Sequence, residues 1–144
     1  MSKPLHVFLA EDNPGDVELV REALREHHID FQLAVASNGA EARRYIEAMG
    51  TTEDAPCPDL LLLDLNLPQT DGYDLFAIFR AHPLCTLTPV IVVTSSDAPK
   101  DRERAAALGA ARYFRKPSEL AEYMELGSLI REVVTESGVL LPGA

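Results

Sequence analysis

Hydrophobic positions along the chain form short continuous runs, separated by longer stretches in which apolar residues recur every three or four positions. The runs predict five strands, at Leu5–Ala10, Phe31–Ala36, Leu60–Leu63, Val90–Val93 and, more weakly, Arg112–Phe114. The third and fourth runs, LLLL and VIVV, are uninterrupted, which is typical of strands buried on both faces of a parallel sheet. The second run alternates more, as an edge or half-covered strand does.

Helical periodicity fills the interval after each run. Asn13 followed by Pro14 predicts a helix start, and Asn38 with Glu41 three residues later resembles a capping box. Three further helices are predicted to begin at Gly72, at Asp97–Pro99 and after a capping Ser118, the second of them ending at Leu108-Gly109. Five β-α units in succession predict an α/β fold, a doubly wound (βα)5 parallel sheet with helices on both faces.

The chain is expected to form one domain over residues 1–136, with a short tail at 137–144. Its 144 residues, 47% of them apolar, suffice for a single core. Met49–Pro58 is predicted to be a longer surface loop. The tail carries Val139-Leu140-Leu141, and two interpretations stay open: a loose end, or part of an interface with a second copy. Because exposed apolar clusters tend to mark contacts, the second is favoured.

Charge and cysteine content narrow the function classes. The net charge of −10 argues against binding to nucleic acid or anionic membranes, since both rest on Lys and Arg. Leu5–Ala10 is too short for a signal peptide or a membrane span. Two cysteines, Cys57 and Cys85, are too few for a disulfide scaffold or a zinc site. They are expected to be reduced thiols in a cytoplasmic protein.

Polar residues that could carry chemistry follow four of the predicted strands. They are Glu11 and Asp12, Asp64, Thr94 and Ser95, and Lys116. Ligands of doubly wound sheets bind at the carboxyl ends of the strands, so these side chains are expected to gather at one edge. Each residue alone has an ordinary explanation, such as an acidic pair favoured at a helix N-terminus. Three carboxylates together repel by on the order of a few kcal/mol per pair, which a hard cation such as Mg²⁺ would offset.

The spacing and the flanking segments of this set resemble a known family. Asp64 and Thr94 are 30 residues apart, and Thr94 and Lys116 are 22 apart. The surrounding segments are LLLLDLNLPQTDGYDL, PVIVVTSS and ALGAARYFRKP. From Leu5 to Val134 the chain resembles the receiver domain of two-component response regulators. The resemblance implies the flavodoxin-like fold of CheY, with strand order 2-1-3-4-5.

The resemblance also implies a phosphorylation site. Asp64 would be the nucleophile that takes a phosphoryl group from the phosphohistidine of a histidine kinase. Asp12 and Asp64 would hold Mg²⁺ directly, with the backbone carbonyl of Asn66 as a further ligand and Glu11 acting through water. Lys116 would neutralise charge on the phosphoryl oxygens.

Several other positions take roles from the same resemblance. The Lys116–Pro117 peptide bond is expected to be cis, which would hold the lysine inward. Thr94 and Tyr113 would form the switch pair, with the hydroxyl moving to the phosphoryl group and the ring filling the vacated space. The remaining positions would accommodate the phosphate or tune its lifetime; they are Ser95, Asn66 and Ser96.

A narrower resemblance concerns output. With DLNLPQTDG and no effector domain, the chain resembles the single-domain regulators that accompany phytochrome-type histidine kinases. This implies no DNA-binding output, and a signal passed to a separate protein. A homodimer is expected through the helix that begins at Pro99, the strand Arg112–Phe114 and the last helix.

Two other functions fit the sequence less well. A Mg²⁺-dependent phosphohydrolase of the haloacid dehalogenase type also uses an aspartate nucleophile. Its signature needs a second aspartate two residues later, where this chain has Asn66, and its nucleophile follows the first strand rather than the third. A scaffold with a decayed receiver site is disfavoured because every catalytic position is filled.

Overall fold

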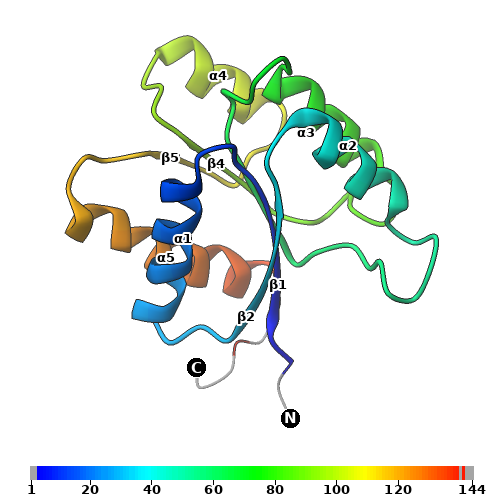
Figure 1. The fold of residues 1–144 in the computed structure, drawn as a ribbon, viewed down its shortest axis with the longest axis horizontal. Coiled ribbons are helices and arrows are strands. Elements are labelled where there is room, and N and C mark those ends of the chain that lie inside the picture. Colours follow the sequence, from blue (N-terminus) through cyan, green and yellow to red (C-terminus); the bar gives the residue numbers. More distant parts are fainter. Residues whose placement is uncertain (1–2, 140, 142–144) are drawn as a thin grey trace.

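The computed structural model describes residues 3–139 and 141, and over these residues five strands and five helices alternate along the chain (Figure 1). The strands are β1 Leu5–Ala10, β2 Phe31–Ala36, β3 Leu60–Leu63, β4 Val90–Thr94 and β5 Arg112–Arg115. The helices are α1 Pro14–Glu26, α2 Gly39–Ala48, α3 Gly72–Ala81, α4 Pro99–Ala107 and α5 Leu120–Glu136. The predicted β-α order is confirmed, and β4 and β5 each extend one residue further than predicted.

The strands form one parallel sheet in the order β2-β1-β3-β4-β5, as predicted. Helices α1 and α5 pack on one face, and α2, α3 and α4 pack on the other (Figure 1). Strands β3 and β4 are buried along their whole length, whereas β2 at the edge mixes buried, half-buried and exposed residues. The continuous and the alternating apolar runs thus predicted the correct positions in the sheet.

The run LLLL of β3 is continuous because the sheet has a core on each face. Leu60 and Leu62 belong to the apolar cluster beneath α1 and α5, and Leu61 and Leu63 belong to the cluster beneath α2 and α3. Successive side chains of a strand point to opposite faces, so a strand between two helical layers needs apolar residues at every position.

Local capping sets the start of α1 and the end of α4. The side chain of Asn13 accepts hydrogen bonds from the backbone N–H groups of Gly15 and Asp16, with Pro14 at the first helical position. Gly109, with φ of +91°, follows α4 in the left-handed region where glycine is favoured. Both features match the sequence prediction.

Two other predicted helix starts differ in detail. The side chain of Asn38 accepts from the N–H of Glu41, as in a capping box, but the Glu41 carboxylate accepts from the hydroxyl of Ser37 instead of closing the box. The prediction that Ser118 caps the last helix is wrong, because α5 begins at Leu120 with no side-chain cap on its first turn. Further along the helix, α5 packs closely against α1. A Cβ on Gly127 would lie 2.4 Å from the carbonyl oxygen of Ala23, so glycine permits this close approach.

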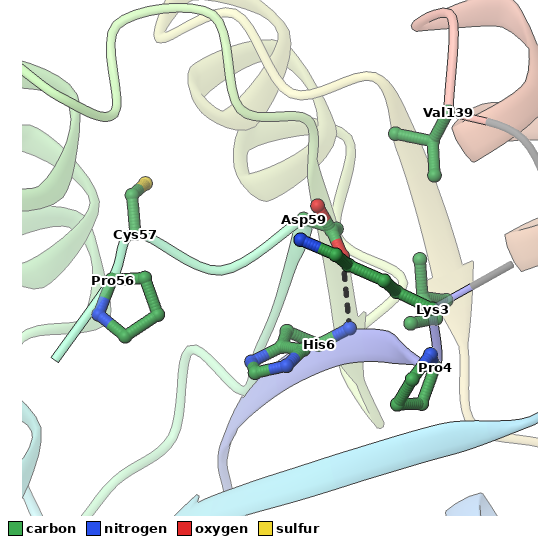
Figure 2. Close-up of a pocket in the computed structure, with 8 residues that line it drawn as sticks. Lys3, Pro4, His6, Pro56, Cys57, Asp59 and Val139 are labelled. Atoms are coloured by element: carbon green, nitrogen blue, oxygen red, sulfur yellow. Dashed lines mark hydrogen bonds between the residues drawn. The ribbon is translucent and has the colours of Figure 1, made fainter. Parts of the chain in front are cut away.

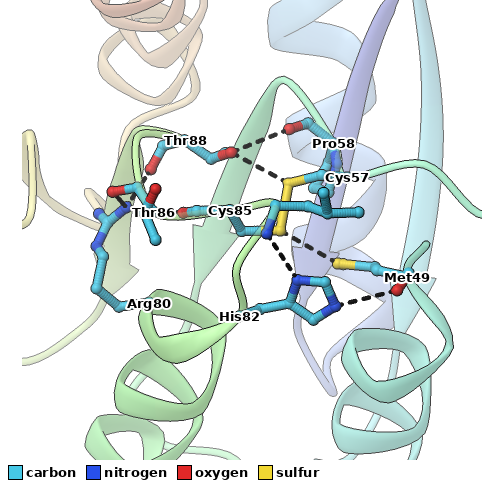
Figure 3. The surroundings of a disulfide bond; sticks show 9 residues. Met49, Cys57, Pro58, Arg80, His82, Cys85, Thr86 and Thr88 are labelled. Carbon is cyan, nitrogen blue, oxygen red and sulfur yellow. Dashed lines mark hydrogen bonds between the residues drawn. A yellow bond between two sulfur atoms is a disulfide. The ribbon is translucent and has the colours of Figure 1, made fainter.

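Cys57 and Cys85 form a disulfide, so the expectation of two reduced thiols is wrong. Cys57 lies in the loop before β3 and Cys85 in the loop before β4, and these strands are neighbours in the sheet. The two Cα atoms are therefore 6.0 Å apart, within the usual range for a disulfide. Figure 3 shows the surroundings: Thr88 Oγ1 lies 3.2 Å from Cys57 Sγ, and Met49 Sδ lies 3.5 Å from Cys85 Sγ. The number of cysteines carried no information about this proximity.

Two described residues of the tail after α5, Val139 and Leu141, pack on the chain's own domain. Leu141 is only 6% exposed and joins the apolar cluster of the α1 and α5 face, against which Val139 also packs. The tail interface was predicted from exposed leucines, and burial in the chain's own core removes Leu141 from such a role. Leu140 lies outside the described residues. Within residues 3–139 and 141, no helix is both long and apolar enough to cross a membrane.

Candidate functional site

The carboxyl ends of β1 and β3 bring two acidic residues side by side. Ala10 pairs with Leu63 in the parallel register, so the next residues, Glu11 and Asp64, emerge together. The backbone N–H of Asp64 donates to the carbonyl of Ala10 at 3.0 Å and extends the pairing by one residue. The predicted gathering of side chains at this edge is confirmed for these positions and for Asp12, Thr94 and Lys116.

Three carboxylates form a compact group at this edge. Oxygen atoms of Glu11, Asp12 and Asp64 lie within 4.8 Å of one another. Glu11 is 1% exposed and Asp64 4% exposed, whereas Asp12 faces solvent. Hard oxygen donors at this separation are the ligands that Mg²⁺ and similar divalent cations prefer. The residues present therefore fit such an ion.

Lys116 supplies the positive charge of the site. Its Nζ lies 2.6 Å from Glu11 Oε1, 2.9 Å from Asp64 Oδ2 and 3.0 Å from Asp16 Oδ2. The expected cis bond before Pro117 is not found, since every peptide bond among the described residues is trans. The three ion pairs hold the lysine inward without it.

Asp16 and Tyr123 belong to this network and were missed in the sequence. Asp16 lies in the first turn of α1, and its Oδ1 accepts a hydrogen bond at 3.3 Å from the hydroxyl of Tyr123 on α5. The only signal was an acidic residue four positions after Asp12, and such a residue is ordinary at a helix N-terminus. Nothing local marks Tyr123, which is 107 residues away from Asp16.

Asn66 connects Asp64 to Thr94. The backbone N–H of Asn66 donates to Asp64 Oδ1 at 2.9 Å, and its side-chain amide donates to Thr94 Oγ1 at 3.1 Å. Thr94 is completely buried at the end of β4. A change at the Asp64 carboxylate would therefore reach the Thr94 hydroxyl through one residue.

The Ser96 peptide contacts both residues of the predicted switch pair. Its N–H donates to Thr94 Oγ1 at 3.4 Å, and its carbonyl accepts from the hydroxyl of half-buried Tyr113 at 2.8 Å. The guanidinium carbon of Arg102 lies 4.5 Å from the centre of the Tyr113 ring. The Ser96 hydroxyl donates to Asp101 of α4. Ser95 is exposed beside the site.

The electrostatics of the site favour an added cation. Burial raises the pKa of Glu11 to about 7, the hydrogen bond from Lys116 opposes this rise, and the charge of Asp64 adds to it. For Lys116, burial by itself lowers the pKa, but hydrogen bonds to Glu11 and Asp64 outweigh burial and raise it above its ordinary value. The lysine therefore stays charged. When ionised, the carboxylates of Glu11, Asp12, Asp16 and Asp64 leave three negative charges uncompensated by Lys116.

The Glu11 shift predicts a pH dependence of stability in the absence of metal. Its pKa is raised from 4.5 to about 7, so its stabilising contribution is complete below pH 4.5 and is lost as the pH rises through about 7. Between pH 4.5 and about 7 the free energy of unfolding should fall by on the order of 2–3 kcal/mol, since one pKa unit corresponds to about 1.4 kcal/mol. Urea unfolding of wild type and Glu11→Gln in EDTA should show this slope only in wild type. Parallel pH profiles would contradict the assignment.

A separate cavity lies at the opposite, amino end of the strands (Figure 2). It has a volume of about 330 Å³ and is lined by residues that include Lys3, His6, Cys57, Asp59 and Val139. The Asp59 carboxylate accepts from the backbone N–H of His6 at 2.9 Å. This cavity shares no residue with the acidic cluster and is a separate feature of the fold.

Comparisons with known proteins agree with this arrangement. The chain matches the family model of the response regulator receiver domain over residues 7–126. It is 33% identical to the response regulator Rcp1 of Synechocystis sp. (strain ATCC 27184 / PCC 6803 / Kazusa) over 98% of this chain and 95% of Rcp1. These matches favour a receiver over the haloacid dehalogenase alternative.

Solved structures show the same fold. The phosphorylated cyanobacterial phytochrome response regulator RcpA matches with a TM-score of 0.82 and 31% identity, over 98% of this chain and all of RcpA. The Mn²⁺-bound form of Rcp1 matches with a TM-score of 0.80 and 32% identity, over 97% of this chain and 100% of Rcp1. The receiver domain of the kinase PA1611 of Pseudomonas aeruginosa PAO1 has magnesium in its active-site cleft. It matches with a TM-score of 0.72 and 26% identity, over 92% of this chain and 99% of that domain.

Proposed function

Because the chain belongs to the response regulator receiver family of two-component systems, we propose that Asp64 is its phosphoacceptor. The observation that carries this proposal is the position of the Asp64 carboxylate, buried between the Lys116 ammonium and the Asn66 N–H. One carboxylate oxygen attacks the phosphorus of a phosphohistidine. The new O–P bond forms as the N–P bond breaks, and the electron pair leaves with the imidazole.

Mg²⁺ is the proposed cofactor. Asp12, Asp64 and the backbone carbonyl of Asn66 would hold it, with Glu11 acting through water, and the ion would supply positive charge to the phosphoryl oxygens. The Mn²⁺ bound to Rcp1 and the magnesium bound to the PA1611 receiver domain support a divalent ion in this family. The excess of negative charge among the carboxylates supports it in this chain.

The remaining residues act after transfer. The Lys116 ammonium moves from the Asp64 carboxylate to a phosphoryl oxygen, where it balances the added charge. The Thr94 hydroxyl exchanges its bond with Asn66 for one with the phosphoryl group, and the Tyr113 ring turns into the space that opens. Ser95 leaves room beside the phosphate. Asn66 and Ser96 set the lifetime of the aspartyl phosphate. In this proposal the domain phosphorylates and dephosphorylates itself rather than turning over a substrate.

The proposed donor is a histidine kinase of the phytochrome type, because the phytochrome response regulator RcpA and the bacteriophytochrome response regulator AtBRR both match nearly the whole chain. We place the protein in the cytoplasm, where kinases find ATP, with residues 1–136 as the receiver. The signal passes to a separate protein, as the match over 95% of Rcp1 supports. A homodimer would use the face of α4, β5 and α5. Ala105 is the one buried residue of α4, so the rest of that helix is available to contact a second copy.

Phosphorylation in vitro tests the proposed function. Incubation with acetyl phosphate and Mg²⁺ should add one phosphoryl group to the intact protein, and EDTA should abolish the addition because the phosphoryl charge would lack its cation. Intact-mass spectrometry at successive times measures both. An unmodified mass, or an adduct that forms equally well in EDTA, would exclude the proposal.

A panel of histidine kinases tests the donor. Phosphotransfer from purified, phosphorylated kinases should be fastest for light-sensing members, because the chain matches the phytochrome response regulator RcpA over nearly its whole length. Loss of label from the kinase together with its gain by this protein is the readout. Equal transfer from every kinase would remove the phytochrome assignment and leave the assignment of Asp64 standing.

A further inference from the structure

We propose that Asp16 is a positioning residue for phosphoryl transfer, which keeps Lys116 in place when its other two partners are taken up by the reaction. The proposal rests on the proposed function of Asp64 and of the metal-binding carboxylates. It assigns a role to Asp16 and to the Tyr123 hydroxyl that orients it.

Lys116 divides its ammonium group among three carboxylates. The Nζ atom lies 2.6 Å from Glu11, 2.9 Å from Asp64 and 3.0 Å from Asp16, and the lysine side chain is largely buried. An ammonium has three hydrogens, so each carboxylate can accept one of them. The resting position of the lysine is thus a balance among three attractions.

The reaction removes two of these attractions. The Asp64 carboxylate loses a negatively charged oxygen when that oxygen becomes bonded to phosphorus. Glu11 belongs to the acidic cluster with Asp12 and Asp64, and under the proposed function its carboxylate would hold the metal through water. Asp16 lies outside that cluster, so of the three partners it alone keeps its charge free for Lys116 throughout the reaction.

The structure holds Asp16 in a defined orientation. Its backbone N–H donates to the side chain of Asn13, which fixes the first turn of α1. The Tyr123 hydroxyl donates to Oδ1 while Lys116 donates to Oδ2, so both carboxylate oxygens have a partner. Tyr123 is 2% exposed and packs edge-to-face against Phe114 of β5, with ring centres 5.9 Å apart. The carboxylate is therefore held from α5 as well as from α1.

Loss of the Asp16 charge would shift Lys116 toward the metal ligands. With two partners left, the ammonium would bind Glu11 and Asp64 more strongly and would compete with Mg²⁺ for their oxygens. Both Mg²⁺ binding and the placement of the ammonium on the phosphoryl group would suffer. Misplacing a charged group in this way costs rate even where it makes no bond to the reacting atoms.

The first experiment compares Asp16→Asn with a matched control, Glu18→Gln, which removes an exposed carboxylate from the same helix. Asp16→Asn should raise the Mg²⁺ dissociation constant and lower the rate of phosphorylation by acetyl phosphate at saturating Mg²⁺, each by about tenfold. Tyr123→Phe, which removes only the hydroxyl, should change both in the same direction by about threefold. Isothermal titration calorimetry gives the affinity, and intact-mass spectrometry gives the rate.

A double-mutant cycle separates positioning from simple charge. In a Lys116→Met background, Asp16→Asn should change the Mg²⁺ affinity by no more than about twofold, because its effect passes through the lysine. A tenfold effect that persists without Lys116 would overturn the proposal, as would an Asp16→Asn variant indistinguishable from Glu18→Gln. The Mg²⁺ titration needs no phosphorylation. A wild type that binds Mg²⁺ but never gains a phosphoryl group would instead refute the assignment of Asp64.

Discussion

Asp64→Asn is expected to abolish formation of the phosphoryl adduct. The amide has nearly the same shape as the carboxylate, but its single carbonyl oxygen can accept from only one of the two donors, Asn66 N–H or Lys116, and it has no anionic oxygen to attack phosphorus. With acetyl phosphate and Mg²⁺, intact-mass spectrometry should show full modification of wild type and none of the variant. Asp74→Asn, at an exposed aspartate on α3, should be modified like wild type.

The fold of the Asp64→Asn protein should persist. Lys116 keeps its ion pairs with Glu11 and Asp16, and one member of a repelling carboxylate group is removed. Circular dichroism and urea unfolding check this point, so that loss of phosphorylation is not confused with loss of structure. The same adduct on folded Asp64→Asn protein, mapped by peptide analysis, would transfer the phosphoacceptor role to another residue.

Opening the disulfide between Cys57 and Cys85 is expected to lower the free energy of unfolding by roughly 3–4 kcal/mol. The bond closes a loop across 28 positions of sequence, and a cross-link of this span removes that much chain entropy from the unfolded state. Urea unfolding with and without a reducing agent measures the difference. Cys57→Ser is the matched control, because its stability should be low and insensitive to the reductant.

The disulfide should matter little for phosphorylation. It lies before β3 and β4, whereas Asp64 and Lys116 follow β3 and β5, at the opposite end of the parallel sheet. The reduced protein, while folded, should be modified by acetyl phosphate at the same rate as the oxidised protein. A slower rate would show that the two ends of the sheet are coupled. An unchanged midpoint in urea would show that the bond does not constrain the unfolded chain.

The sequence predicted those parts of the fold that depend on local pattern. The continuous runs of β3 and β4 and the alternation of β2 reflect how many faces of each strand are covered, and this count is visible in the periodicity. The proximity of Glu11, Asp64 and Lys116 could be predicted from the sequence, because each residue directly follows a strand of one parallel sheet. Their roles were inferred from the family resemblance.

The features that the sequence did not reveal all depend on contacts between distant segments. Asp16 meets Lys116 across 100 residues and Tyr123 across 107, and neither residue has a local pattern that marks it.

By itself, the sequence determined a (βα)5 sheet with an acidic, lysine-containing edge, since hydrophobic periodicity and strand ends are properties of consecutive residues. Only the tertiary structure decided that Lys116 has a third carboxylate partner, that Cys57 and Cys85 are joined, and that Leu141 is buried in its own domain. The physical reason is common to all three. Each depends on the distance between segments that only chain folding brings together, and no property of consecutive residues reveals that distance.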